Sequence, residues 1–165
     1  LSFDRDKIDP SQTEVRRVFG GLLVQESDPA PEEVMTADVA TEAQPSDEQR
    51  TAMEFAWRVV KHVKSNAIVF ATHDRTLAIG GGATSRVDAV LNAVAKAGRV
   101  GLDLDGCVLA SDAFFPFPDG LEAAVEAGAA AVVQPGGSNR DELVIEAANK
   151  LKVPMLMTGK RHFRH

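Results

Sequence analysis

The chain has 165 residues, 44% of them hydrophobic and 25% charged, a composition ordinary for one globular domain. No apolar run approaches the roughly 18 residues of a membrane span, and no secretory signal pattern opens the chain. The single cysteine, Cys107, excludes an internal disulfide framework and a multi-cysteine zinc site. We therefore expect a cytoplasmic protein with no membrane partner, in which Cys107 is a small core residue. Since the first residue is Leu1, the chain is either processed or a piece of something longer.

The net charge of −6 is distributed unevenly along the chain. Residues 25–49 contain eight acids and no Lys or Arg, which leaves 18 basic against 16 acidic residues elsewhere. A nearly neutral body fits a small anionic ligand better than a nucleic acid, which requires a concentrated basic face. No nucleic-acid partner is expected.

The first part of the chain reads as a strand followed by an acidic segment. Residues 17–25 have strand character, and Gly20-Gly21 indicates a bulge or a close backbone approach within that strand. The acidic stretch, residues 25–49, is either a solvated linker or contributes a short edge strand at Val34-Met35.

The first helix has a clear start signal. Ser46 and Gln49 form a capping-box pattern, and apolar residues then recur at helical spacing over residues 52–63. This predicts an amphipathic helix that ends near Lys64. The pair Lys61-His62 resembles a base and proton donor, but the apolar face lies elsewhere, so we expect this pair to point to solvent.

The remaining chain alternates short apolar runs with helical patterns, which is typical of an α/β domain with helices layered on a sheet, α/β/α. The predicted elements are strands at 67–71 and 76–79 joined as a hairpin, a helix from Ser85 to about Ala97, a strand at 107–110, a helix at 119–127, a strand at 131–134, a helix at 140–151 and a strand at 155–158.

Three turns each join a predicted strand to a predicted helix, at residues 80–86, 111–120 and 134–140. In open α/β sheets, ligands bind beyond the carboxyl ends of the strands. Gly80-Gly81-Gly82 permits close backbone approach, and Arg86 offers a charge that grips a phosphate or carboxamide. A tight structural turn is the alternative, because the pattern matches neither the phosphate loop nor the Rossmann fingerprint.

The turn at residues 111–120 holds three of the eight phenylalanines of the chain, around Pro116. This spacing fits neither helix nor strand and predicts a rigid aromatic turn. Aromatic walls suit a flat organic ligand, with Asp112 and Asp119 as polar groups. The alternative is a buried turn that plugs a small core.

Two further features allow a structural or a functional interpretation. Asn66, just past a helix end, is typical of a turn residue. The tail, residues 160–165, carries three fixed positive charges and two histidines. It is either a disordered end or, if Phe163 anchors it to the body, it makes Arg161 a candidate phosphate ligand.

Several of these segments together resemble one family, the bifunctional proteins of purine biosynthesis that combine AICAR transformylase with IMP cyclohydrolase. The similarity runs from about Arg16 to the last residue and covers the C-terminal part of the transformylase half. The segments that carry it, in order, are Val18 to Gln25, Lys64-Ser65-Asn66-Ala67, Ile79-Gly80 with Ser85-Arg86-Val87, Ser111 to Phe117, Gln134 to Ser138 and Arg161 to His165.

The resemblance implies a fold and a domain organisation. Residues 16–165 would be the second of two cytidine-deaminase-like subdomains of the transformylase half, preceded by a lead-in at residues 1–15. The zinc signature of the deaminases is absent from the chain, so no metal site is expected. Family members sometimes hold a potassium ion near the segments that match residues 63–65 and Asp112.

The resemblance also implies an activity, the transfer of a formyl group from the co-substrate 10-formyltetrahydrofolate to the 5-amino group of AICAR. Family sites form across a homodimer interface, so a homodimer is implied. Carried over by position, Asn66 and Arg86 would contact AICAR, Arg161 would hold its phosphate, and Phe114, Asp119, Ser138, Asn139 and the backbone at Val87 would line the folate side.

The chain departs from the family pattern at two turns. It has Gly81-Gly82-Ala83-Thr84 where the family commonly has Gly-Ala-Gly-Gln, and Pro118 where the family has an arginine. Loss of that arginine is expected to weaken affinity for the acidic tail of the folate.

The catalytic residues are not identified. The family's catalytic Lys-His pair belongs to a Ser-Phe-Lys-His motif of the first subdomain, which is absent here, and Lys61-His62 is not its match. The missing first subdomain is therefore an expected partner. Two other hypotheses stay open: a ligand-binding or assembly domain of the same fold without catalysis, and an unrelated mononucleotide-binding α/β protein.

Overall fold

The computed structural model describes residues 13–28 and 34–164. The chain divides into two compact units between residues 31 and 32. The predicted lead-in at residues 1–15 lies mostly outside the described residues. Because the first described strands belong to a separate unit, the assignment of residues 16–165 to one subdomain stays a prediction.

The first unit is a β-hairpin made of β1 (Thr13–Val18) and β2 (Gly21–Glu26). The strands pair antiparallel in unbroken register, from Thr13 opposite Glu26 to Val18 opposite Gly21. Gly20 has a φ of 79°, a conformation open to glycine at little cost, so the chain reverses at Phe19-Gly20. The prediction of one strand with a bulge at Gly20-Gly21 is therefore wrong, since the glycine makes a turn between two strands.

The second unit contains a six-stranded mixed sheet in the order β3-β8-β7-β6-β4-β5. Within the two described ranges, no helix is both long and apolar enough to cross a membrane. The strands are β3 (Asp38–Val39), β4 (Ile68–Ala71), β5 (Thr76–Gly80), β6 (Val108–Ser111), β7 (Ala131–Gln134) and β8 (Met155–Met157), and the helices are α1 (Asp47–Val60), α2 (Arg86–Val100), α3 (Asp119–Glu126) and α4 (Asp141–Lys150).

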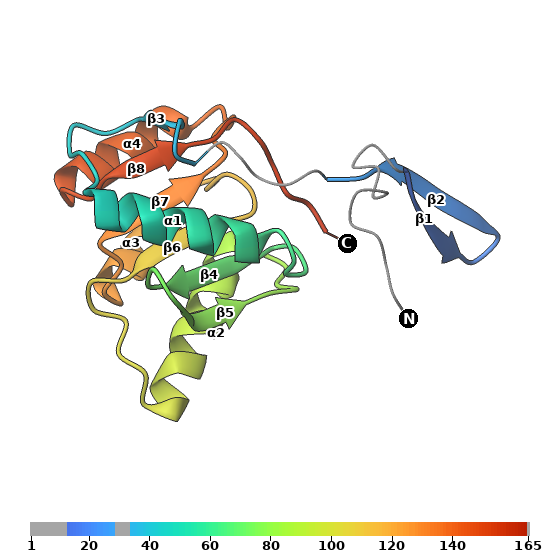
Figure 1. Cartoon of the computed structure of the whole chain (residues 1–165), viewed down its shortest axis with the longest axis horizontal. Coiled ribbons are helices and arrows are strands. Elements are labelled where there is room, and N and C mark those ends of the chain that lie inside the picture. Colours follow the sequence, from blue (N-terminus) through green and yellow to red (C-terminus); the bar gives the residue numbers. More distant parts are fainter. Residues whose placement is uncertain (1–12, 29–33, 165) are drawn as a thin grey trace. The chain divides into compact units, whose positions relative to one another are not determined.

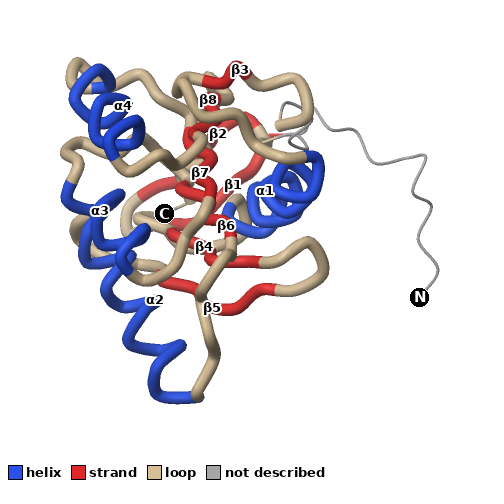
Figure 2. Tube along the Cα trace, turned by 90° about the vertical axis from the view of Figure 1, so that its left-hand side faces the viewer, coloured by secondary structure: helices blue, strands red, loops and turns tan. Residues whose placement is uncertain are grey.

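The helices cover both faces of this sheet. Helix α1 lies over one face, and α2, α3 and α4 lie over the other (Figures 1 and 2). Side chains alternate between the two faces, as in any strand. Ile68 and Phe70 of β4 pack in the cluster under α2, whereas Val69 and Ala71 pack in the cluster under α1. The predicted layered α/β/α arrangement is confirmed.

Cys107 lies in the core on the face of α2, with 2% of its surface exposed. Burial raises the pKa of its thiol to about 12, because the thiolate is poorly solvated there. The prediction of a small core residue is confirmed.

Helix α1 begins as its sequence predicts. The Gln49 N–H donates to Ser46 Oγ (3.1 Å), and the Ser46 N–H donates to Gln49 Oε1 (2.9 Å), which completes the capping box. The helix ends at Val60, four residues before the predicted Lys64. Bonds of the i→i−3 type from His62 and Val63 tighten the chain after Val60 and close the helix early.

In the described residues 34–49, the acidic stretch is part of the second unit and is not a solvated linker. Val34 lies in a turn and is buried, with 1% exposure, against the cluster under α1. The edge strand of this segment is β3, which pairs antiparallel with β8. The prediction of a strand at Val34-Met35 is therefore misplaced, because Val34 is used as a core anchor of the turn that leads into β3.

The strand directions place several chain segments at one edge of the sheet. Strands β5, β6, β7 and β8 run parallel to one another, while β4 runs antiparallel between β5 and β6. The carboxyl ends of these four strands therefore share an edge, here called the carboxyl edge, with the amino end of β4. The turns at residues 80–86, 111–120 and 134–140 follow β5, β6 and β7 and lead into α2, α3 and α4, as predicted.

The glycine run has a packing role at this edge. A Cβ at Gly80 would lie 1.9 Å from the carbonyl oxygen of Ala89 on α2, and one at Gly81 would lie 2.5 Å from Val63 Cγ1. Only residues without a side chain let α2 and the end of α1 approach β5 this closely. The structural interpretation of the glycine turn is thus supported at these two positions.

Replacing Gly80 with Ala is expected to lower the free energy of unfolding by about 1–3 kcal/mol, the range for overpacking a filled site. Gly98→Ala is the matched control, because no atom lies within 4 Å of its added Cβ on α2. It is expected to be neutral or to stabilise by up to about 1 kcal/mol. Urea unfolding followed by the fluorescence of Trp57 measures both, and equal midpoints for the two variants would contradict the close approach.

Candidate functional site

A buried ion pair lies at the centre of the carboxyl edge. The carboxylate of Asp112, just after β6, accepts hydrogen bonds from Ser65 Oγ, from the Ala67 N–H (3.0 Å) and from Arg86 Nη1. Asp112 and Arg86 are both buried. A buried carboxylate is stable only when donors surround it and a cation balances it. Asp112 therefore ties together β6, the start of β4 and the start of α2.

Arg86 in turn orients Asn66. Its Nη2 donates to Asn66 Oδ1 (2.9 Å), and its Nη1 also donates to the Ala67 carbonyl (2.9 Å). The other end of the Asn66 amide donates from Nδ2 to the Ala83 carbonyl (3.0 Å). The Ser65-Asn66 peptide bond is cis. The amide of Asn66 is thus held from both ends.

A hollow of about 310 Å³, here called the Asn66 hollow, opens beside these groups. Arg86 Nε is buried and has no hydrogen-bond partner among the residues that the structure describes. Buried N–H groups are nearly always bonded, so this donor is an exception among the groups around the hollow. The lining residues are Asn66, Thr84, Ser85, Arg86, Ala113, Phe114, Pro116 and Phe163.

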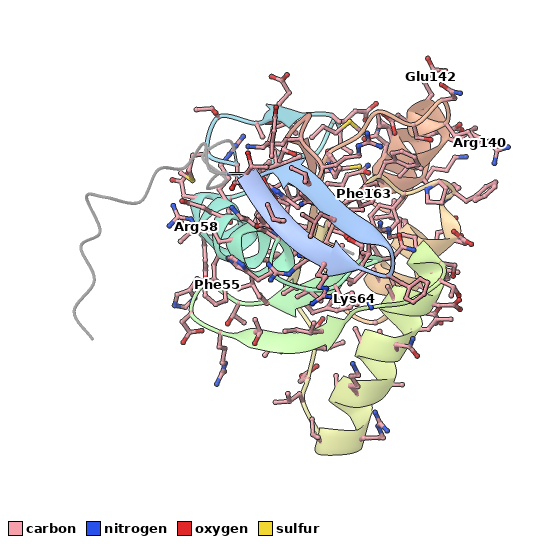
Figure 3. The ribbon with its side chains drawn as sticks, turned by 90° about the vertical axis from the view of Figure 1, so that its right-hand side faces the viewer. Phe55, Arg58, Lys64, Arg140, Glu142 and Phe163 are labelled. Carbon is pink, nitrogen blue, oxygen red and sulfur yellow. The ribbon has the colours of Figure 1, made fainter. Side chains whose placement is uncertain are left out.

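A second hollow of about 340 Å³, here called the Ser138 hollow, lies next to the first. The two share Phe114 and Pro116, so the aromatic turn forms the wall between them. The Ser138 hollow is lined by Phe114, Pro116, Gly137, Ser138, Asn139 and Arg140. Figure 3 shows the Arg140 side chain projecting outward near the start of α4.

The three phenylalanines of the aromatic turn have three different environments. Phe114 is half-buried between the hollows, whereas Phe115 is fully buried and its N–H donates to Gln134 Oε1 (3.0 Å). Phe117 is 49% exposed, with the Arg140 guanidinium carbon 4.3 Å from its ring centroid. The buried-turn interpretation is therefore supported at Phe115, and the ligand-binding interpretation stays a prediction for Phe114.

The structure brings five predicted site residues to the hollows: Asn66, Arg86, Phe114, Ser138 and Asn139. In the described part of the chain, the other three line neither hollow. Val87 is half-buried in the first turn of α2. Asp119 is exposed, and its Oδ1 accepts from the Gly120 N–H (2.8 Å) at the start of α3.

Arg161 is the third predicted residue that lines neither hollow in the described part of the chain. It is exposed beside the Asn66 hollow, with its guanidinium carbon 5.3 Å from the ring centroid of Phe163. The tail is anchored differently from the expectation, since Phe163 is 44% exposed whereas His162 is 1% exposed. The His162 ring packs against Trp57, at 4.6 Å between centroids. Sequence reasoning missed this anchor, because the contact joins His162 to Trp57, a residue far away in the sequence.

The remaining predictions concern residues outside the hollows. His62 is exposed and Lys61 half-buried, which agrees with the solvent-facing placement of His62. Across residues 13–28 and 34–164 there is no group of three or more His, Cys, Asp or Glu suited to a metal ion. The expected potassium site near Asp112 stays a prediction, and that carboxylate already accepts three hydrogen bonds.

A larger hollow of about 540 Å³ lies around the loop between β4 and β5, away from all predicted site residues. Four of its polar side chains are engaged in local structure. Ser46 and Gln49 bond to each other's backbone in the capping box, and Thr72 Oγ1 bonds to Asp74 Oδ1 (2.7 Å). The carboxyl edge is therefore the better candidate for a ligand site.

The fold and the two hollows define a layered α/β domain that presents a buried arginine and an aromatic wall at the ends of its strands. Residues 1–96 match the family described as "AICARFT/IMPCHase bienzyme". The chain belongs to this family, and the unrelated mononucleotide-binding hypothesis is thereby excluded.

Several relatives carry the name bifunctional purine biosynthesis protein PurH. The protein of Chloroflexus aurantiacus is 59% identical over 92% of this chain and 30% of its own length. Those of Anaeromyxobacter dehalogenans and Acidithiobacillus ferrooxidans are 53% and 52% identical over 92% and 91% of the chain, and 28% and 29% of their own lengths. The chain thus spans less than a third of the relatives that it matches.

Replacing Asp112 with Asn is expected to lower the free energy of unfolding by about 3–5 kcal/mol, because it leaves the buried Arg86 without a countercharge. The control is Glu54→Gln, which breaks the more exposed i,i+4 pair with Arg58 and is expected to cost less than about 1 kcal/mol. Chemical unfolding measures both. Similar small losses in the two variants would show that Asp112 does not hold the edge together.

Proposed function

We propose that this chain is the second, cytidine-deaminase-like subdomain of an AICAR formyltransferase and supplies binding residues for AICAR and 10-formyltetrahydrofolate. The reaction would be formyl transfer in purine (IMP) biosynthesis. The observation that carries the proposal is the pair of hollows divided by Phe114, one of which is lined by Asn66 and the buried Arg86. Family membership and the names of the relatives support it.

AICAR is assigned to the Asn66 hollow. Its carboxamide and ring nitrogens accept and donate hydrogen bonds, for which the side chains of Asn66 and Arg86 that line the hollow are suited. Arg161 is assigned to the phosphate, since a guanidinium binds phosphate oxygens with two parallel bonds. Its exposed position next to Phe163 suits the charged end of the nucleotide.

The folate is assigned to the Ser138 hollow. Phe114 offers a ring face to the flat pterin, and Ser138 and Asn139 offer a hydroxyl and an amide. The Asp119 carboxylate and the Val87 backbone are assigned to the rim. Because the hollows share a wall, the formyl donor and the amine of AICAR would lie close together, the proximity that formyl transfer requires.

The catalytic groups are assigned outside this chain. The amine of AICAR is a weak nucleophile, so the reaction needs a base and a stabiliser for the oxyanion. The residues placed at the hollows are binding groups. The first transformylase subdomain, in a homodimer with sites at its interface, would supply the catalytic pair. A ligand-binding or assembly domain without catalysis is the alternative, favoured by the absence of the Ser-Phe-Lys-His motif.

The first test is to mix the chain with AICAR and 10-formyltetrahydrofolate, follow tetrahydrofolate formation by absorbance and measure AICAR binding by calorimetry. We expect binding without turnover. Turnover would place catalytic groups within these residues and contradict the assignment to another subdomain. Absence of AICAR binding would contradict the assignment of the Asn66 hollow.

Replacing Arg161 with Ala is expected to weaken AICAR binding about tenfold or more, the loss of one charged hydrogen-bonding partner. Arg99→Ala is the control, because Arg99 is exposed in the last turn of α2, far along the chain from the hollow residues. Calorimetric titration compares the two. An unchanged affinity in the Arg161 variant would refute its phosphate role.

Arg140 offers a positive charge on the folate side, where Pro118 stands in place of the family's arginine. Arg140→Ala is expected to weaken binding of a folate with a polyglutamate tail by about three- to tenfold and to affect a folate analogue without glutamate less, because exposed charge pairs are weak. Equal effects on the two ligands would show that Arg140 does not contact the acidic tail.

A further inference from the structure

The C-terminal segment, residues 160–164, forms no helix or strand. Backbone hydrogen bonds nevertheless connect this end of the chain to successive strands at the carboxyl edge. After β8, the N–H groups of Thr158 and Gly159 donate to the carbonyls of Gln134 and Pro135 at the end of β7 (3.0 and 2.9 Å). The His162 N–H then donates to the Asp112 carbonyl after β6 (2.9 Å). The segment therefore crosses the ends of β7 and β6 in their order in the sheet.

The segment is next tied to the start of β4. The Ser65 N–H donates to the Arg164 carbonyl (2.9 Å), and the Arg164 N–H donates to Ser65 Oγ (2.9 Å). Ser65 also donates its hydroxyl to the carboxylate of Asp112. The tail is thus bound by its backbone to the same groups that hold Asn66 and Arg86.

The side chains of residues 160–164 differ in burial. His162 points inward and is 1% exposed, with its ring tilted by 58° against Trp57 of α1. Its neighbours Arg161 and Phe163 are exposed. His162 is therefore the single side chain that buries the tail in the body, among residues 160–164.

This burial has a consequence for the Asn66 hollow. Phe163 lines the hollow, and the guanidinium of Arg161 lies over the ring of Phe163. Neither residue has a buried side chain to hold its place. The residue between them, His162, has the buried side chain of this part of the tail.

We propose that His162 is a positioning residue, whose burial against Trp57 docks residues 160–164 on the carboxyl edge and thereby places Phe163 and Arg161 at the Asn66 hollow. Ordering five residues costs conformational entropy, and the buried aromatic contact is one contribution that offsets it. The docking stands on the geometry alone. Its consequence for AICAR, a nucleotide monophosphate, rests on the proposed function.

Docking is tested first, without any ligand. In the wild-type chain, hydrogen exchange at the His162 and Arg164 amides is expected to be slowed, because both donate to groups of the body. Limited trypsin digestion, followed by mass spectrometry, reports cleavage after Lys160 and Arg161. His162→Ala is expected to speed this cleavage about tenfold or more, because the segment opens more often without the buried ring and each opening exposes the cleavage sites to trypsin.

The matched control is Phe163→Ala, which removes a larger but exposed ring and is expected to leave the cleavage rate near that of the wild type. His162→Phe keeps an aromatic ring against Trp57 and is expected to restore protection. Trp57 is the only tryptophan, and its emission is expected to shift to longer wavelength in His162→Ala alone. Unprotected tail amides in the wild type would overturn the docking role, and so would faster cleavage of the tail in Phe163→Ala. Both results can be obtained even if His162→Ala fails to fold.

The link to the ligand is tested by a double-mutant cycle with AICAR. If His162 acts by placing Arg161, each single alanine variant is expected to weaken AICAR binding about tenfold, and the double variant no further. Additive losses would overturn the positioning role. A wild-type chain that protects its tail but does not bind AICAR would overturn the proposed function and support the docking alone.

Discussion

The buried ion pair between Asp112 and Arg86 is the interaction on which the rest of the carboxyl edge depends. Neither charge is tolerated in the interior without the other. Through Arg86 the pair orients Asn66, and through Ser65 it reaches the tail. One carboxylate thereby connects segments near the middle, the second half and the end of the chain.

The carboxyl edge of the sheet therefore contains two kinds of groups, a buried structural network and the side chains that line the hollows. The ion pair is buried and structural, whereas the hollows on either side of Phe114 are lined by polar side chains. Arg86 belongs to both sets, because its Nη1 takes part in the ion pair and its side chain lines the Asn66 hollow. A single guanidinium thus connects the buried pair with the wall of a hollow.

Much of the fold was predictable because its signals are local. The capping box at Ser46 and the hydroxyl cap at Ser85 start α1 and α2 where the sequence indicates. One failure concerns a residue whose surroundings are distant in sequence, and the other concerns a local turn. Val34 has strand-forming character but is used as a core anchor, and the chain reverses at Phe19-Gly20 where a bulge was expected.

For the candidate site, the local sequence is enough to indicate which turns follow strands. It also shows which residue types lie in or near these turns, among them Asn66, Arg86 and Phe114. Hydrophobic periodicity and helix caps depend on neighbours within a few positions, so they can be read without the fold. The burial of Phe115 beside the half-buried Phe114, and of His162 beside the exposed Phe163, follows from the tertiary structure alone. Phe115 packs in the core cluster under α2 and His162 packs against Trp57 of α1, and both contacts join residues that are distant in the sequence.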